Sequence, residues 1–314
     1  MSRATNAVIA VVGSLNVDIL ADVQRLPRPG ETVVATQVIT RYGGKGANQA
    51  LAAARQGARV TMIGCVGDDP EGRTYMDQLR REGITVSTMK TARATSTGTA
   101  FIAVSSENAE NQIIVHPGAN GQLTAATVRN QRARIAVASA LLVQLEVPLE
   151  AVLAAIEIAN ETRIPVVLNP SPVQADFPWG SCRIDCLIVN QTEAQAVFGL
   201  DAGTLETETA AWSAALAEKK VQTLIITRGS QPTQTLHQGV YQTVPTHPVS
   251  PIDTVGAGDT FAGVFAAQHH SGKPFLEAVR WANVAGALAT LKPGAQEGIP
   301  MAGDITQAIA AADE

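Results

Sequence analysis

The segment Val8-Ile9-Ala10-Val11-Val12, followed at once by Gly13-Ser14-Leu15-Asn16-Val17-Asp18, indicates how this chain folds. A short, mostly β-branched run that ends in a glycine and small polar residues is typical of a strand buried on both faces. Similar runs recur at 60–63, 140–143, 166–168, 187–189 and 224–226, and alanine-rich helical stretches such as 48–56 and 149–160 lie between them. This alternation predicts an α/β fold, in which a mainly parallel sheet lies between two layers of helices.

Two regions interrupt the alternation of strands and helices. Residues 31–42 and 97–115 each contain strand-like residues with no helix between them. Strands that are joined without a crossover pair in antiparallel fashion, so these segments predict a small accessory sheet. We expect it to be formed by insertions at about 17–42 and 97–117 into a single domain that spans 1–314.

Composition excludes several classes of protein. Of the 314 residues, 46% are hydrophobic and only 16% are charged, which is enough apolar material for a continuous core. The net charge is −5 and no run of Lys and Arg exceeds two residues, so the chain lacks the charge pattern of proteins that bind nucleic acids or membrane surfaces. The longest apolar stretches reach about half of the roughly 20 residues that a bilayer span needs. With three cysteines, too few for a disulfide framework, the sequence predicts a cytoplasmic protein without nucleic-acid or membrane partners.

Polar residues follow five of the predicted strands, at 13–18, 144–146, 169–170, 190–193 and 227–229. In open α/β sheets, ligands bind in the crevice beyond the carboxyl ends of the strands. A single polar strand end has a bland explanation, because loops are generally polar. Five such ends with short hydrogen-bonding side chains favour a site for a polar small molecule.

Two glycine-rich segments each begin a predicted helix, namely Gly43-Gly44-Lys45-Gly46-Ala47-Asn48 and Asp253-Thr254-Val255-Gly256-Ala257-Gly258-Asp259. Glycines before a helix let backbone N–H groups surround an anion at the positive end of the helix dipole. Neither segment has the spacing of the dinucleotide-binding GxGxxG motif or of the P-loop. The sequence therefore predicts anion binding by another kind of loop.

Asp259 lies in the first turn of the second of these helices. An acid there could serve only as a helix cap, which gains about 0.3–1 kcal/mol from the dipole. A cap does not require Gly256, Ala257 and Gly258 before it. Three adjacent backbone amides beside a carboxylate can neutralise a phosphoryl group in transfer while the carboxylate accepts the proton of the attacking hydroxyl.

In these segments and their order the chain resembles the ribokinase-like (PfkB) sugar kinases. The resemblance covers nearly the whole chain and is carried by 13–18, 29–32, 43–48, 67–69, 118–120, 144–146, 169–170, 190–193 and 253–259. It implies a ribokinase-like three-layer α/β/α domain with a nine-stranded sheet and a small β-sheet lid. It also implies ATP as phosphoryl donor, a pentose as acceptor, and Mg²⁺ and K⁺ as metal cofactors.

The same resemblance implies the roles of individual residues. For the sugar these are Asn16, Asp18, Gly44, Lys45, Asn48, Glu146 and Asp259. For the nucleotide and Mg²⁺ they are Asn190, Glu193, Thr227, Gly229, Gly258 and Asn283. For K⁺ they are the Asp253 side chain and the carbonyls of Val255, Ala289, Lys292 and Gly294. The family has a serine near the K⁺ where this chain has Gly298, which offers no hydroxyl.

These observations favour ATP-dependent phosphorylation of the primary (5-) hydroxyl of D-ribose, which gives ribose 5-phosphate. A 2-deoxyribose or nucleoside kinase of the same family and a non-catalytic sugar-binding sensor are the alternatives. Asn16 and Asp18 favour ribose, because a site built for a 2-hydroxyl leaves polar groups unpaired without it. Asp259 argues against a sensor, which needs no base. The apolar residues of the lid exceed what one closing face can cover, so we also expect a homodimer that is joined through the lid.

Overall fold

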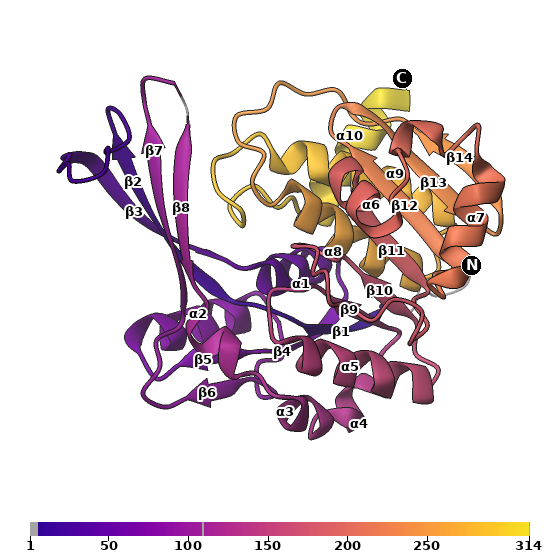
Figure 1. The fold of residues 1–314 in the computed structure, drawn as a ribbon, viewed down its shortest axis with the longest axis horizontal. Helices are drawn as coiled ribbons and strands as arrows, with labels where there is room; N and C mark the ends of the chain where they lie inside the picture. The colour runs from indigo at the N-terminus through magenta and orange to yellow at the C-terminus, as the bar shows by residue number, and fades with distance from the viewer. Residues whose placement is uncertain (1–5, 109, 314) are drawn as a thin grey trace.

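A computed structural model describes residues 6–108 and 110–313, so the ends of the expected 1–314 domain and residue 109 of its second insertion lie outside the described residues. The central sheet is made of β1 (Val8–Val12), β4 (Arg59–Ile63), β9 (Ala140–Val143), β10 (Val166–Leu168), β11 (Cys186–Asn190), β12 (Thr223–Arg228), β13 (Gln231–His237) and β14 (Val240–Val244). Their order is β14-β13-β12-β11-β10-β9-β1-β4 (Figure 1). The six strands from β12 to β4 are parallel, and β13 and β14 add an antiparallel edge. The prediction of a mainly parallel sheet is confirmed.

Within the described residues the central sheet has eight strands, whereas the resemblance implied nine. Beyond β4, Thr85 forms only an isolated parallel bridge with Thr61. The chain turns directly afterwards, where the Met89 amide donates to the Val86 carbonyl at 3.0 Å. Pairing therefore stops after one residue.

Helices cover both faces of the central sheet. One layer holds α1 (Lys45–Arg55), α2 (Pro70–Arg81), α8 (Ala257–His270), α9 (Phe275–Ala289) and α10 (Ala302–Asp313). The opposite layer holds α3 (Ala125–Arg129), α4 (Arg132–Ile135), α5 (Leu149–Glu161), α6 (Gln191–Phe198) and α7 (Thr209–Glu218). The strand residues alternate between two cores, because Ile9 and Val11 of β1 belong to one buried cluster and Ala10 and Val12 to the other. None of the helices within the described ranges has the length and apolar character needed to cross a bilayer.

A separate four-stranded sheet extends away from this body (Figure 1). Its strands, in the order β3-β2-β7-β8, are β3 (Ala35–Gly43), β2 (Asn16–Val23), β7 (Gly98–Ser105) and β8 (Asn111–His116). Each insertion forms an antiparallel pair, as predicted, but the two pairs join through β2 and β7, which run parallel. Residues 16–18, the polar residues that follow β1, are the first residues of β2, so the small sheet begins close to the expected start of the insertion at about 17. Two short strands, β5 (Cys65–Gly67) and β6 (Lys90–Ala92), pair beside the base of this small sheet.

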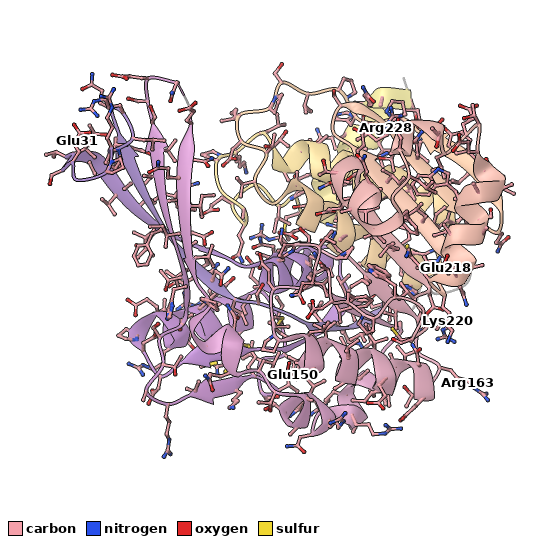
Figure 2. All side chains as sticks on the ribbon, viewed as in Figure 1. Glu31, Glu150, Arg163, Glu218, Lys220 and Arg228 are labelled. Atoms are coloured by element: carbon pink, nitrogen blue, oxygen red, sulfur yellow. The ribbon has the colours of Figure 1, made fainter. Side chains whose placement is uncertain are left out.

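The register of the small sheet gives its two faces different chemistry. Asn16, Asp18 and Leu20 alternate with Val17, Ile19 and Ala21, so the polar residues share one face. The opposite face carries the row Ile19, Phe101 and Ile114, in which Phe101 is 48% and Ile114 is 70% exposed. In Figure 2, Glu31 lies at the outer end of this sheet, far from the opposite edge of the body, where Glu218 and Lys220 lie. The face of Asn16 and Asp18, called the polar face below, is polar only near the main domain. Farther out it carries Leu20, which pairs with Ile39 and Ile102, and Ile113, which pairs with Ile102 and is 54% exposed.

Candidate active site

A cavity of about 260 Å³ lies at the carboxyl ends of the parallel strands. Its walls include Lys45, Asn190, Glu193, Thr227, Gly256, Gly258 and Asp259, all of which the sequence singled out. They come from the starts of α1, α6 and α8 and from the end of β12. The structure therefore brings both glycine-rich segments to the same cavity.

Asp259 is 7% exposed in the first turn of α8, and each of its carboxylate oxygens accepts a hydrogen bond from a side-chain amide. Asn48 Nδ2 donates to Oδ2 at 3.0 Å, and Gln49 Nε2 donates to Oδ1 at 3.0 Å. Hydrogen bonds to a charged group are worth about 1.5–3 kcal/mol each, and they offset the cost of burying the charge. Each oxygen keeps a further lone pair with which to accept a proton.

The loop before α8 leaves open space next to this carboxylate. Gly256, the N-cap of α8, has a positive φ of 77° and supplies no side-chain cap. Apart from its chain neighbours and the backbone of its own helix, no atom lies within 4 Å of the place where a Cβ would project from Gly258. The positive end of α8 therefore faces free space beside Asp259, an arrangement suited to an anion.

Glu146 joins the sugar-side residues to the start of α1. Its Oε2 accepts hydrogen bonds from Ser14 Oγ at 2.6 Å and from the Lys45 amide at 3.2 Å. The N-cap of α1, Gly44, makes no side-chain cap. Glu146 therefore caps this helix from a distant part of the chain, in addition to any contact with a ligand.

Asn16 and Asp18 lie next to each other on the polar face of the small sheet. Asn16 Oδ1 accepts a hydrogen bond from Asn120 Nδ2 at 2.8 Å. Burial, together with the smaller effect of the negative charges of Glu146 and Glu297, raises the pKa of Asp18 from 3.8 to about 6. Asn16, Asp18 and Glu146 do not line the cavity described above, whereas Lys45 and Asp259 do. Of the residues that the resemblance assigned to the sugar, Lys45 and Asp259 therefore reach the cavity, and we call the whole set the sugar-side residues.

A second cavity, of about 620 Å³, adjoins the first and shares Thr227 and Gly258 with it. Its lining is largely apolar and includes Gly229, Ala257, Asn283, Pro248, Pro251 and Phe261. Asn283 uses its side chain to organise the wall, because Nδ2 donates to the carbonyls of Val244 and Pro245 and Oδ1 accepts from Thr233 Oγ1 at 2.7 Å. A polar cavity joined to a larger apolar one has the form of a site for a phosphorylated aromatic ligand.

Asn190 and Glu193 form a capping box at the start of α6. The Asn190 amide donates to Glu193 Oε2 at 2.9 Å, and the Glu193 amide donates to Asn190 Oδ1 at 2.8 Å. Glu193 Oε1 takes no part in this box and belongs to a side chain that lines the polar cavity. One carboxylate suits Mg²⁺, which keeps much of its water and binds phosphates for the rest. These residues therefore fit the metal that the resemblance implied.

Asp253 and the end of α9 form the region where a monovalent cation was expected. Asp253 Oδ1 accepts from the Val255 amide at 3.0 Å, and Oδ2 accepts from the Gly294 amide at 2.8 Å. Ala289 is the last residue of α9, and Lys292 lies in the turn between it and Gly294. A carboxylate together with backbone carbonyls offers the oxygen ligands that K⁺ prefers. The donor set fits the cation.

Gly298 distinguishes this cation region from the family pattern. A Cβ at this position would lie 2.1 Å from the Ala289 carbonyl oxygen. No side chain fits there without a shift of the backbone. The backbone conformation of this loop is therefore incompatible with a serine at position 298.

Several polar residues near Asp259 had no place in the sequence interpretation. Gln49 bonds to Asp259 directly, and Gln296 Nε2 donates to Asn48 Oδ1 at 3.0 Å and to the Tyr75 hydroxyl at 2.7 Å. Glu297 Oε1 lies 3.7 Å from Arg41 Nε, and this ion pair connects the small sheet to the loop after α9. The sequence did contain a signal for Gln49, because two amide side chains, Asn48 and Gln49, stand side by side in an alanine-rich helix. Gln296, Tyr75 and Glu297 carried none.

A doubly covered α/β sheet with a carboxylate and glycine amides at its carboxyl edge is the architecture of a small-molecule phosphotransferase. Residues 6–302 match the model of the pfkB family carbohydrate kinases, so the chain belongs to this family and is a carbohydrate kinase. It is 38% identical to a ribokinase of Haemophilus influenzae over 93% of this chain and 95% of that protein. It is 32% identical to a deoxyribokinase of Salmonella typhi over 93% and 95% of the two chains. The structure of Arabidopsis thaliana ribokinase complexed with ribose and ATP superimposes with a TM-score of 0.86 at 28% identity, over 97% of this chain and 99% of that one.

The raised pKa of Asp18 predicts a pH-dependent stability cost. Between pH 3.8 and about 6 the folded chain holds a proton on Asp18 that the unfolded chain releases, so the charged carboxylate destabilises the fold above about pH 6. We expect Asp18→Asn to stabilise the protein at about pH 7.5 by on the order of 1–3 kcal/mol, since each pKa unit is worth about 1.4 kcal/mol. The gain should shrink as the pH falls through 6 and should be absent near the ordinary pKa of 3.8. Thermal unfolding of both proteins across this range measures it.

Asp22→Asn is the matched control, because Asp22 lies on the same strand and face, nearer the outer end. It should leave the melting temperature nearly unchanged at every pH. A gain from Asp18→Asn of equal size in acid and at neutral pH would contradict the assigned cause.

Proposed function

We propose that this carbohydrate kinase transfers the γ-phosphoryl group of ATP to the 5-hydroxyl of D-ribose and gives ribose 5-phosphate. The observation that carries the proposal is the position of Asp259. Its carboxylate is held by two buried amides, next to the open space at Gly258, where the sugar-side residues meet the polar cavity. The similarity to ribokinases over nearly the full length supports ribose as the acceptor.

In this mechanism Asp259 accepts the proton of the 5-hydroxyl as the oxygen attacks phosphorus. The backbone amides of Gly256, Ala257 and Gly258 would donate to the phosphoryl oxygens, on which negative charge is spread. The Ala257 amide would do so by giving up its hydrogen bond to the Thr254 carbonyl, which is 3.3 Å long in this structure. Lys45, at the start of α1, lines the same cavity and adds a positive charge. Proton acceptance and charge stabilisation would thus both come from the start of α8, at one small cavity that Lys45 also lines.

The nucleotide is proposed to occupy the second cavity, with its phosphates in the first. Thr227, Gly229 and Asn283 would line the adenosine side, and Asn190 and Glu193 would hold Mg²⁺ largely through water. When bound, Mg²⁺ neutralises charge on the phosphates. The side chains of Asn190 and Glu193 are already ordered by their capping box, so the site is preorganised.

The sugar is proposed to lie against the polar face of the small sheet, which would act as a lid. Asn16 and Asp18 come from that face, and Gly44, Lys45, Asn48 and Glu146 come from the body below it. Short amide and carboxylate side chains offer both donors and acceptors to sugar hydroxyls. Asn48 makes this contact only by sharing its amide, which already binds Asp259 and Gln296.

The 2-deoxyribose alternative is favoured by one observation, the similarity to a deoxyribokinase. A coupled assay of ADP release with D-ribose, 2-deoxyribose, fructose and adenosine distinguishes the acceptors. We expect kcat/KM for ribose to exceed that for 2-deoxyribose at least ~10-fold, because groups that pair with a 2-hydroxyl would be left unpaired.

Asp259→Asn should lose ~10²–10⁴-fold in kcat while calorimetry still detects ribose binding, since a general base contributes about that much. Near-normal turnover by this variant, or a preference for another acceptor, would overturn the respective assignment.

We also propose that Asp253 and the carbonyls of Val255, Ala289, Lys292 and Gly294 bind K⁺ beside the anion-binding loop. Activity in K⁺ should then exceed activity in Na⁺, because the smaller ion fits a cage of this kind poorly. Asp253→Asn should remove the difference between the two ions. Equal rates of the wild-type protein in K⁺, Na⁺ and a buffer without either ion would contradict the site.

The exposed face of the small sheet supports a further proposal, that two copies of the chain form a two-fold dimer through it. Ile19, Phe101 and Ile114 lie in one row on the face opposite Asp18, and a contiguous apolar patch of this kind marks an interaction surface. Ile114→Asp should convert the dimer to a monomer, because the charge would be buried without a partner. Sedimentation measures both states, and a wild-type monomer at micromolar concentration would contradict the proposal. Glu110→Gln, near the start of β8, is a control that should leave the dimer intact.

A further inference from the structure

Gln49 is a fully buried glutamine that touches Asp259 from behind the cavity. It is 0% exposed and lines neither cavity. Its Nε2 donates to Asp259 Oδ1 and to Asn169 Oδ1, both at 3.0 Å. Its Oε1 accepts a hydrogen bond from Gln144 Nε2 at 2.6 Å. Every polar atom of the Gln49 side chain is therefore paired.

These partners fix which way the Gln49 amide points. A carboxylate only accepts hydrogen bonds, so the nitrogen of Gln49 must face Asp259 and the oxygen must face Gln144. Asn169 is itself anchored, because its Nδ2 donates to the Ile188 carbonyl at 2.9 Å. The Asp259 carboxylate is thereby connected through Gln49 to the ends of the central strands β9, β10 and β11.

The backbone around Gln49 is held as firmly as the side chain. Helices α1 and α8 approach so closely at Gly263 that a Cβ there would lie 2.3 Å from the Gln49 carbonyl oxygen. The distance between Gln49 and Asp259 is therefore set by the contact of two helices, with no flexible loop involved. Without the hydrogen bond from Gln49, Asn48 would be the only remaining side-chain donor to the Asp259 carboxylate among the described residues, and rotation about the Cβ–Cγ bond has a broad preference.

We propose that Gln49 is a positioning residue for the reaction, which holds the Asp259 carboxylate in the orientation that accepts the proton of the sugar hydroxyl. The inference rests on the proposed role of Asp259 as the base. Gln49 touches neither cavity, so its loss should impair the chemical step and spare substrate binding. Small misplacements of a catalytic group cost up to ~10²-fold in rate.

The experiment is a double-mutant cycle with Gln49→Met and Asp259→Asn, measured as kcat and KM for ribose and ATP. Methionine keeps the length of the side chain and removes its hydrogen bonds. We expect Gln49→Met to lower kcat ~10–100-fold while each KM changes less than ~3-fold. In the Asp259→Asn background the same substitution should cause no further loss, because the group that it orients is no longer a base.

A merely structural glutamine gives a different result. In that case Gln49→Met would change KM or the melting temperature along with kcat. It would also lower kcat by the same factor in the wild-type protein and in the Asp259→Asn background. If the two substitutions act independently and Asp259→Asn alone still lowers kcat, the proposed role of Gln49 is overturned and the proposed role of Asp259 as the base stands. Near-normal turnover by Asp259→Asn alone would instead remove the base, and the role of Gln49 with it.

Two further variants keep the test decisive. Gln56→Met, at the C-cap of the same helix, removes a side chain whose Nε2 donates to the Pro300 carbonyl at 3.2 Å and whose Oε1 accepts from Gln268 Nε2 at 3.4 Å, and it should leave kcat unchanged. Gln144→Met removes the donor to Gln49 together with a buried oxygen, Oε1, that has no hydrogen-bond partner, so this variant should fold even if Gln49→Met does not. It should lower kcat by a smaller factor, again with no effect in the Asp259→Asn background. A Gln144→Met protein with unchanged kcat would contradict the proposal.

Discussion

The architecture of the site depends on keeping one carboxylate charged in a nearly closed environment. Asp259 is 7% exposed at the start of α8, where an unpaired charge would cost several kcal/mol, about the whole net stability of many domains. Two buried amides from α1 pair with its two oxygens, and the dipole of α8 favours the charge further. The close contact of α1 with α8 at Gly263 makes this pairing geometrically possible. The environment of the proposed base is therefore a product of helix packing as much as of its own position in the sequence.

The surrounding polar groups extend this constraint in two directions. Toward the sheet, Gln49 connects the carboxylate to Gln144 and Asn169 at the strand ends. Toward the small sheet, Gln296 and Tyr75 connect Asn48 to the Gly43 carbonyl, next to the strand that carries Asp18. A network in which most members are paired is rigid, because each lost bond would leave a buried group unsatisfied. Such rigidity suits a reaction that depends on the placement of a proton acceptor.

The main fold could be predicted from the sequence because its signals are local. The short apolar runs gave the parallel strands β1, β4, β9, β10, β11 and β12 to within about two residues, and the two glycine-rich segments do begin α1 and α8. The prediction failed where pairing partners decide the structure. The strand β2 was not predicted, because the strand-like residues of the first insertion were placed in 31–42, whereas Asn16 to Val23 become a strand because β3 and β7 pair with them. The expected ninth strand ends after one bridge because the chain turns away.

By itself, the sequence determined the α/β class and the start of α8 at a glycine-rich loop, and it singled out Asp259 as the candidate base, because each follows from residues that are close together in the chain. Only the tertiary structure decided which side chains orient that base. Gln49 lies 210 positions from Asp259 and Gln296 lies 248 positions from Asn48, and no local pattern records contacts over such separations. It also decided the chemistry of Asp18, whose pKa rises because burial and two distant carboxylates, Glu146 and Glu297, act on it together. Local periodicity specifies elements, whereas the energy of a buried charge depends on everything that the fold places around it.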